Sequence, residues 1–163
     1  MKSLEFHSTA QFIQCVNEAI ELALDDVVAK SVERLIQYIS ENWYEKYSPK
    51  DYQRTFEFLK SIAVIKARMV EDGSIETEIY FNTDKINAHV RKKGLNAHAS
   101  FSGKDVSQVI PEWLELGNSN IVGRKDTVSS DGLHSLDALV KWLSGVFVEE
   151  LAKALKKHGI NIK

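Results

Sequence analysis

Two segments with a strict two-residue alternation constrain the fold of this chain more than any other feature. Small or apolar side chains alternate with larger or charged ones along residues 63–70, and the alternation resumes along residues 75–81. A period of two is typical of a half-buried β-strand. Asp72-Gly73 lies between the segments and favours a tight reversal of the chain. The sequence therefore predicts an antiparallel hairpin of residues 62–70 and 75–81.

The register of this hairpin follows from its turn. A two-residue turn at Asp72-Gly73 would mix apolar and charged side chains on one face. A three-residue loop, 71–73, with Gly73 in the left-handed conformation, keeps the two kinds apart. We predict this bulged loop, because a one-residue slip would reverse every side chain. It pairs Met69 with Ile75 and Ile65 with Ile79 on the apolar face, and Arg68 with Glu76 and Lys66 with Glu78 on the charged face.

A long amphipathic helix is predicted before the hairpin. Apolar residues, beginning with Phe12 and Ile13, recur at steps of three and four from about Thr9 to Tyr44. At 1.5 Å per residue such a helix is about 50 Å long, which is more than a small domain can cover. Its early turns either pack on another long helix or a neighbouring subunit, or the helix bends around its own sheet.

A second helix is predicted from about Ser135 to His158. Ser135 is a favourable capping residue, and a Gly residue at 145 would permit close approach of the first helix. The stripe expected to be buried is Leu136, Leu139, Val140, Leu143, Val146, Phe147, Leu151, Ala154 and Leu155. The fold class is therefore α+β: an antiparallel sheet, made of the hairpin and short strands, packs against a long N-terminal helix and a C-terminal helix. We expect residues 1–163 to form a single domain.

The remaining segments predict short elements and loops. Pro49 ends the first helical region, and a short turn could restart at Ser48. Residues 82–102 read as a long loop with a possible strand near 98–101. Two helical turns follow, one from about Asp105 and one from Pro111 to Gly117. Residues 118–134 form a second loop, and residues 160–162 could add an edge strand.

Composition argues against several classes of protein. The net charge of −2 gives no general reason to expect nucleic acid or a membrane as partner. Cys15 is the one cysteine, so an internal disulfide is excluded and a reducing compartment suits the chain. The first residues lack the apolar core of a signal peptide. We expect the protein to be cytoplasmic when made, with no membrane span.

The sequence contains no arrangement that dictates a chemistry. There is no glycine-rich nucleotide loop, phosphate loop or nucleophile elbow. The acidic pairs Asp25-Asp26 and Glu149-Glu150 lie on helices, where neighbours point about 100° apart and do not converge on one site. Cys15 is expected to be packed. We therefore expect no enzyme, no catalytic residues, no cofactor and no small-molecule substrate.

Two sets of residues are candidate partner-binding residues. The first is Tyr47, Tyr52 and Arg54, where aromatic rings are interleaved with bases as in proteins that stack on single-stranded nucleic acid. The second is the basic trio Arg91, Lys92 and Lys93, which could contact phosphates. Packed rings and solvated bases are the simpler explanation of both sets in an acidic chain, and we favour it. His89 and His98, with Asp84 nearby, lack the spacing of a metal motif, so no metal site is expected.

Several short motifs are shared with a known group of proteins. They are residues 47–55 (YSPKDYQRT), 78–86 (EIYFNTDKI), 96–106 (NAHASFSGKDV) and 110–113 (IPEW) with Gly117. These motifs resemble a family of small minor structural proteins of tailed phages and prophages of Gram-positive bacteria. The order of long helix, sheet and closing helix is also similar to neck and tail-completion proteins, which form rings where head meets tail. Asn82 and Ala99 depart from the pattern.

The resemblance implies a structural subunit of virion assembly, with other virion proteins and copies of itself as partners. It would reside in the host cytoplasm before incorporation into a virion. It implies no catalytic residues. The alternatives are a nucleic-acid-binding accessory protein that uses Arg54 and Arg91-Lys92-Lys93, and a hydrolase or metal-dependent enzyme with a site that only folding assembles.

Overall fold

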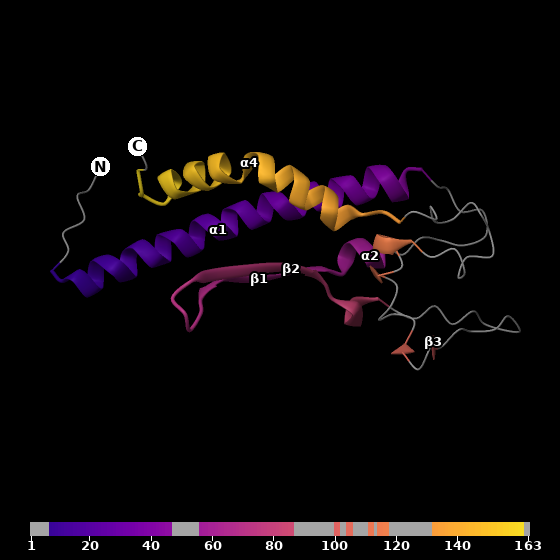
Figure 1. Cartoon of the computed structure of the whole chain (residues 1–163), viewed down its shortest axis with the longest axis horizontal. Helices are drawn as coiled ribbons and strands as arrows, with labels where there is room; N and C mark the ends of the chain where they lie inside the picture. Colours follow the sequence, from indigo (N-terminus) through magenta and orange to yellow (C-terminus); the bar gives the residue numbers. More distant parts are fainter. Residues whose placement is uncertain are drawn as a thin grey trace, which may run out of the picture. The chain divides into compact units, whose positions relative to one another are not determined.

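The computed structural model describes residues 7–46, 56–86, 100–101, 104–105, 111–112, 114–117 and 132–161. Two long helices and a two-stranded antiparallel sheet dominate it (Figure 1). The elements are α1 (Thr9–Ile39), η1 (Ser40–Tyr44), α2 (Glu57–Lys60), β1 (Ile62–Met69), β2 (Ile75–Phe81), η2 (Thr83–Lys85), β3 (Ser100–Phe101), β4 (Lys104–Asp105) and α4 (Ser135–Lys157). The predicted α+β class is confirmed, including the long N-terminal helix, the hairpin and the C-terminal helix.

The chain divides into two compact units. Unit 1 comprises Met1–Ser31, Val64–Ile79 and Trp142–Lys163, and unit 2 comprises Val32–Ala63 and Tyr80–Lys141. Both long helices and both strands of the hairpin pass from one unit into the other. That the whole chain is a single domain stays a prediction.

Unit 1 has three layers, with α1 in the middle. One face of α1 packs on α4 through a core of Ala23, Val27, Ala154 and Leu155, surrounded by Ile20, Leu143, Leu151 and Ile160. The opposite face of α1 contacts β1 through two acidic side chains. Figure 1 shows this order, with the hairpin on the other side of α1 from the later turns of α4. The small residues Ala23 and Ala154 let the two helices approach each other closely.

The turn of the hairpin has the predicted three-residue loop. Gly73 has a φ of +84°, in the left-handed region that favours glycine. Val70 N donates to Ser74 O at 2.9 Å, and Gly73 N donates to Val70 O at 2.9 Å. Asp72 Oδ1 accepts from Ser74 N at 2.8 Å, which stabilises the loop further. The pairing of Met69 with Ile75 follows from this turn.

The alternation of faces is also confirmed along most of the hairpin. Ile65 and Ile79 are half-buried and Ala67 is buried, whereas Lys66 and Glu78 are exposed. At the end of β1 the prediction is wrong, because the Met69 side chain is 45% exposed.

A uniform register along the whole hairpin, as predicted, is wrong. At the end away from the turn, Asn82 N donates to Ser61 O at 2.7 Å. Two of the hydrogen bonds that join the strands lie between Val70 and Ser74 and between Ser61 and Asn82. Between these bonds the first strand advances nine residues and the second strand eight, so β1 contains one extra residue. An extra residue on one strand is a β-bulge, which shifts the register by one.

The predicted cross-strand ion pairs are absent. The ion pairs formed between residues that the structure describes include neither Arg68 with Glu76 nor Lys66 with Glu78. All four side chains are exposed, where solvation of each charge competes with pairing.

The C-terminus of α4 ends in a Schellman motif. Ile160 N donates to Leu155 O at 2.9 Å and Gly159 N donates to Lys156 O at 3.2 Å, with Gly159 at a φ of +93°. The Ile160 side chain packs on the core beside Leu155, as this motif favours. The predicted edge strand at 160–162 is therefore wrong at Ile160 and Asn161, which complete the helix cap instead.

Other details of α4 differ from the prediction. Val140 and Phe147 were expected in the buried stripe but are exposed, and Val148 is 80% exposed. Gly145 does not serve close helix packing, because a Cβ placed there would have no atom within 4 Å. The apolar side of α4 is wider than the area that its neighbours among the described residues cover.

In unit 2, the last turns of α1 are buried at Leu35 and Ile39, and η1 continues the helix in a π-helical turn to Tyr44. The predicted helix from Thr9 to Tyr44 is therefore continuous, with a change of hydrogen bonding at its end. α2 begins at Glu57, and the turn predicted from Ser48 lies outside the described residues. Phe58 stacks on Phe81, with ring centroids 4.6 Å apart.

The segment before α4 also belongs to unit 2. The strand predicted near 98–101 is confirmed at Ser100–Phe101, which pairs with Lys104–Asp105. Asp105 therefore lies in a strand and does not begin a helix as predicted, because its backbone pairs with Ser100. The predicted turn that ends at Gly117 is confirmed by helical residues 111–112 and 114–116 and by a φ of +78° at Gly117.

The start of α4 is capped from this turn. Glu115 accepts the hydroxyl of Ser135 through Oε1 and Leu136 N through Oε2, the latter at 3.0 Å. Ser135 is fully buried. It was predicted to accept hydrogen bonds as the cap, but its hydroxyl donates to the carboxylate that performs this role. In the described residues, neither long helix has a stretch apolar enough to cross a membrane.

Candidate functional site

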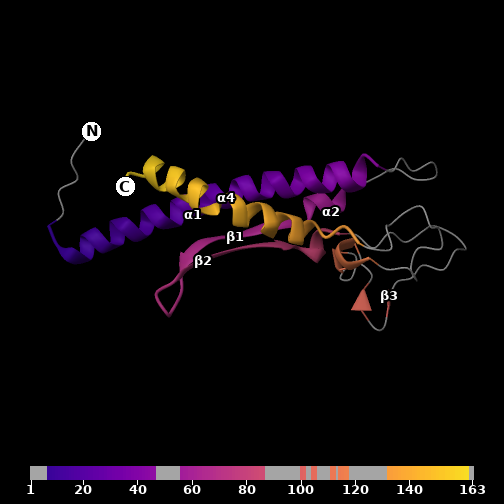
Figure 2. The ribbon, with the colours of Figure 1, turned by 45° about the horizontal axis from the view of Figure 1, so that its top comes forward.

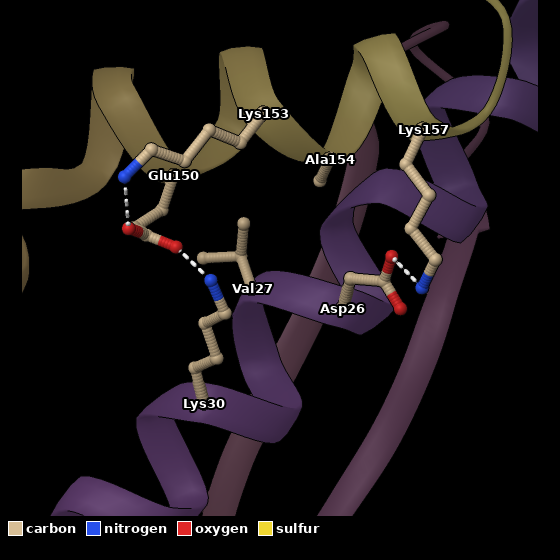
Figure 3. A pocket seen from close by; sticks show the side chains of 7 residues that line it. All are labelled: Asp26, Val27, Lys30, Glu150, Lys153, Ala154 and Lys157. Carbon is tan, nitrogen blue, oxygen red and sulfur yellow. Dashed lines mark hydrogen bonds and ion pairs between the residues drawn. The ribbon is translucent and has the colours of Figure 1, made fainter.

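A charged cluster on α1 and α4 is the first candidate site, and it lies entirely in unit 1. Its side chains line a shallow pocket of about 140 Å³ (Figure 3). The lining residues are Asp26, Val27, Lys30, Glu150, Lys153, Ala154 and Lys157. Val27 and Ala154 form the floor, where the two helices pack, and the charged side chains surround it.

One half of the cluster is centred on Glu150. Its Oε2 accepts from Lys30 Nζ and its Oε1 accepts from Lys153 Nζ at 3.1 Å. The hydrogen bond from Lys30, followed by that from Lys153, lowers the pKa of Glu150. Lys153 also contacts Glu149 Oε1 at 2.6 Å, and the hydrogen bonds to Glu149 and Glu150 raise the pKa of Lys153. Both shifts favour the charged forms, so Glu150 and Lys153 stay ionised at neutral pH.

The other half is centred on Asp26. Its Oδ2 accepts from Lys157 Nζ at 2.7 Å and lies 2.9 Å from His158 Nε2. The hydrogen bond from Lys157, followed by that from His158, lowers the pKa of Asp26. Asp26 thereby ties the second half of α1 in unit 1 to the last turn of α4.

The charged side chains of this cluster form ion pairs that join α1 to α4, an arrangement we call the clamp. Each of its lysines contacts a carboxylate, so none of them is a free base or nucleophile. Ion pairs at exposed positions contribute little individually, typically below about 1 kcal/mol. Their geometry instead fixes the rotation of α4 on α1, which the flat contact between Ala23 and Ala154 alone would not specify.

The two acidic pairs behave differently. As predicted, Asp25 and Asp26 point apart, since Asp25 Oδ1 accepts from Ala67 N at 2.9 Å and Asp26 faces α4. Glu149 and Glu150 both reach the ammonium of Lys153, so they share one cation. The spacings of four and three residues along a helix allow this convergence, and that signal was present in the sequence. That neither pair acts as an acid/base dyad stays a prediction.

The contacts between α1 and α4 carried no signal in the sequence. Lys30 and Glu150 are 120 residues apart, and Asp26 and Lys157 are 131 residues apart. The candidate residues Tyr47, Tyr52, Arg54, Arg91, Lys92 and Lys93, with His89 and His98, lie outside the described residues, so their roles stay predictions. In the part of the chain that the structure describes, no three His, Cys, Asp or Glu side chains are grouped to hold a metal ion.

An exposed apolar surface at the start of α1 is the second candidate site. Thr9 to Gln14 are all exposed, and the first buried residue of the helix is Ala19. Phe12 is 49% exposed and Ile13 is 52% exposed. Apolar side chains gathered at one end of a helix are typical of a surface that contacts another protein.

Acid should weaken the clamp at Asp26. A carboxylate with a lowered pKa in the folded state stabilises the protein above its unfolded-state pKa, and this contribution is lost as the pH falls through the folded-state pKa. The side chain is one-third exposed, so the effect should be small. We expect Asp26→Asn to reduce stability at pH 7 and to make the fall in stability between about pH 5 and pH 2 less steep. Urea unfolding at a series of pH values measures this.

Asp84→Asn is the matched control, since Asp84 is exposed and its carboxylate forms none of the ion pairs of the described residues. Parallel stability–pH curves for the wild type and Asp26→Asn would contradict the role of Asp26.

Comparisons with known proteins identify the family of this chain, but no individual protein that matches it. A family model, YomN, matches residues 8–157, which is nearly the whole chain. No curated protein and no solved structure matches it significantly. The matched range includes α1, the hairpin and α4.

Proposed function

Because this chain belongs to the YomN family, a phage and prophage protein family, we propose that it is a structural subunit of virion assembly. In this proposal it is a head–tail joining subunit, of the neck or tail-completion kind, and it acts by protein–protein interaction. Its partners are other virion proteins and copies of itself. Such a role requires no catalytic residue, cofactor or small-molecule substrate.

The exposed start of α1 is the observation that supports this proposal best. A helix of 31 residues holds its middle turns against α4 and β1, whereas the apolar side chain of Ile13 in its first turns is 52% exposed. Burying such a side chain in a contact would contribute about 1 to 2 kcal/mol. An end of α1 that extends beyond its own core in unit 1 is suited to a neighbouring subunit in a closed assembly.

Deleting the gene from an inducible prophage that carries it tests the role in assembly. We expect induced cells to yield filled heads and separate tails, because the joint between them is missing. Negative-stain microscopy of the lysate distinguishes these from whole particles. Whole, infectious particles without the protein would overturn the proposal.

The contact surface is tested by complementation of this deletion. We expect Ile13→Asp to fold normally, because the side chain is half-exposed, but to restore few whole particles. Gln14→Asp is the control, since it places the same charge one residue away on an exposed polar position. If both variants restore particles equally well, the start of α1 is not a contact surface.

The nucleic-acid-binding accessory protein is the alternative. Its candidate residues Arg54 and Arg91-Lys92-Lys93 predict DNA binding that weakens as salt is raised. A gel-shift titration at two salt concentrations distinguishes it from the assembly role.

A further inference from the structure

The two outer edges of the hairpin in unit 1 differ in their hydrogen bonding to the rest of the protein. On the outer edge of β1, Ala67 N donates to Asp25 Oδ1 at 2.9 Å and Met69 N donates to Glu21 Oε1 at 3.2 Å. Glu21 and Asp25 are one turn apart on α1, so their carboxylates replace the carbonyls that a neighbouring strand would supply. At Ala67 and Met69 the outer edge of β1 is therefore occupied by α1.

In the part of the chain that the structure describes, no strand pairs with the outer edge of β2. Residues of an antiparallel strand point their main-chain groups alternately toward and away from the partner strand. Since Ser74 pairs with Val70, the N–H and C=O groups of Ile75, Thr77 and Ile79 point away from β1. Among the described residues, no hydrogen bond to another element uses these groups. Figure 2 shows β2 on the far side of β1 from α1.

The charges along β2 select what can pair with this edge. Glu76 and Glu78 are exposed and share one face of the strand. The β2 strand of a second copy would place glutamates beside these glutamates, which is unfavourable in a sheet. The β1 strand of a second copy offers a closed edge, because Glu21 and Asp25 occupy it. The edge therefore discriminates against pairing with itself and favours a cationic strand.

We propose that the outer edge of β2 binds an extended segment of another protein as a third strand, and that this segment carries lysine or arginine at alternate positions. The main-chain groups of Ile75, Thr77 and Ile79 would provide the ladder, and the glutamates Glu76 and Glu78 would provide the selectivity. This inference adds a binding site to the proposed function. It rests on the proposed function only for the identity of the partner as a virion protein.

Peptide titrations followed by NMR test this edge. The probes are a synthetic peptide in which lysine alternates with valine and a twin in which glutamate replaces lysine. We expect the lysine peptide to bind about tenfold more tightly than the glutamate peptide, because its charges are opposite to those of Glu76 and Glu78. The amide resonances of residues 75, 77 and 79 should shift most, because their N–H groups face the added strand. Equal binding of the two peptides, or no binding of either at millimolar concentration, would overturn the proposal.

A pair of variants at Thr77 isolates the main-chain contribution. Thr77→Pro removes the outward N–H, and proline is tolerated where the N–H of an edge strand faces solvent. Thr77→Val keeps the N–H, and both variants lose the hydroxyl that donates to Ile65 O at 2.8 Å. We expect the lysine peptide to bind the proline variant about tenfold more weakly than the valine variant. Equal affinities in two folded variants would contradict strand addition.

Should Thr77→Pro unfold, Ile75→Pro takes its place, because proline is accepted at the first residue of a strand. Circular dichroism establishes that each variant is folded. The outcome is separate from that of the prophage deletion: failed peptide binding removes the β2 edge as a docking site, whereas whole particles after deletion remove the role in assembly.

Discussion

Replacing Leu155 with alanine should lower the free energy of unfolding by about 3 kcal/mol, because the change leaves a cavity between α1 and α4. Leu155 is 7% exposed and packs with Ala23, Val27 and Ala154. Ile160, which completes the cap of α4, also packs against this core. Urea unfolding followed by circular dichroism measures the change.

Val148→Ala is the control, because the Val148 side chain lies in solvent on the same helix. Its effect should stay within about 0.5 kcal/mol. A loss below about 1 kcal/mol for Leu155→Ala would show that the packing of α4 on α1 contributes little to stability.

Replacing Glu115 with alanine should destabilise the protein by about 2 kcal/mol. The change removes both acceptors at the start of α4, so the buried hydroxyl of Ser135 and the N–H of Leu136 lose their partner. It also removes a negative charge from the positive end of a helix of 23 residues. Thermal unfolding measures the loss, and hydrogen exchange at residues 136–138 should accelerate.

Two further variants define this effect. Glu112→Ala removes an exposed glutamate from the same turn and should be almost neutral. Glu115→Gln keeps an acceptor oxygen, so it should recover part of the stability. Equal stabilities of the two alanine variants would mean that Ser135 alone caps α4.

The elements were predictable wherever a local pattern specified them. The two-residue alternation identified the hairpin, and Gly73 identified its loop, because both depend on neighbours in the sequence. The start of α1 at Thr9 and that of α4 at Ser135 were likewise correct. The cap of α4 was not, because it comes from Glu115, which is distant in the sequence.

What was missed depends on contacts between distant segments. An apolar stripe shows which residues can be buried but not how much of the stripe the neighbours cover, so Val140 and Phe147 were placed in the core wrongly. The bulge in β1 changes the count of residues on one strand without a glycine to mark it. For the candidate site, the pairing of Lys30 with Glu150 follows only from the packing of α4 on α1.

The carboxylates of Glu21 and Asp25 have a consequence for stoichiometry. A hairpin with two free edges can recruit a strand on each side, and a chain of such additions grows into a fibre. Here α1 of the same molecule occupies the β1 side at Ala67 and Met69, so no strand can be recruited there. If β2 binds a segment as proposed, each copy has one side of the hairpin left for it, and we expect a ratio of one segment to one copy.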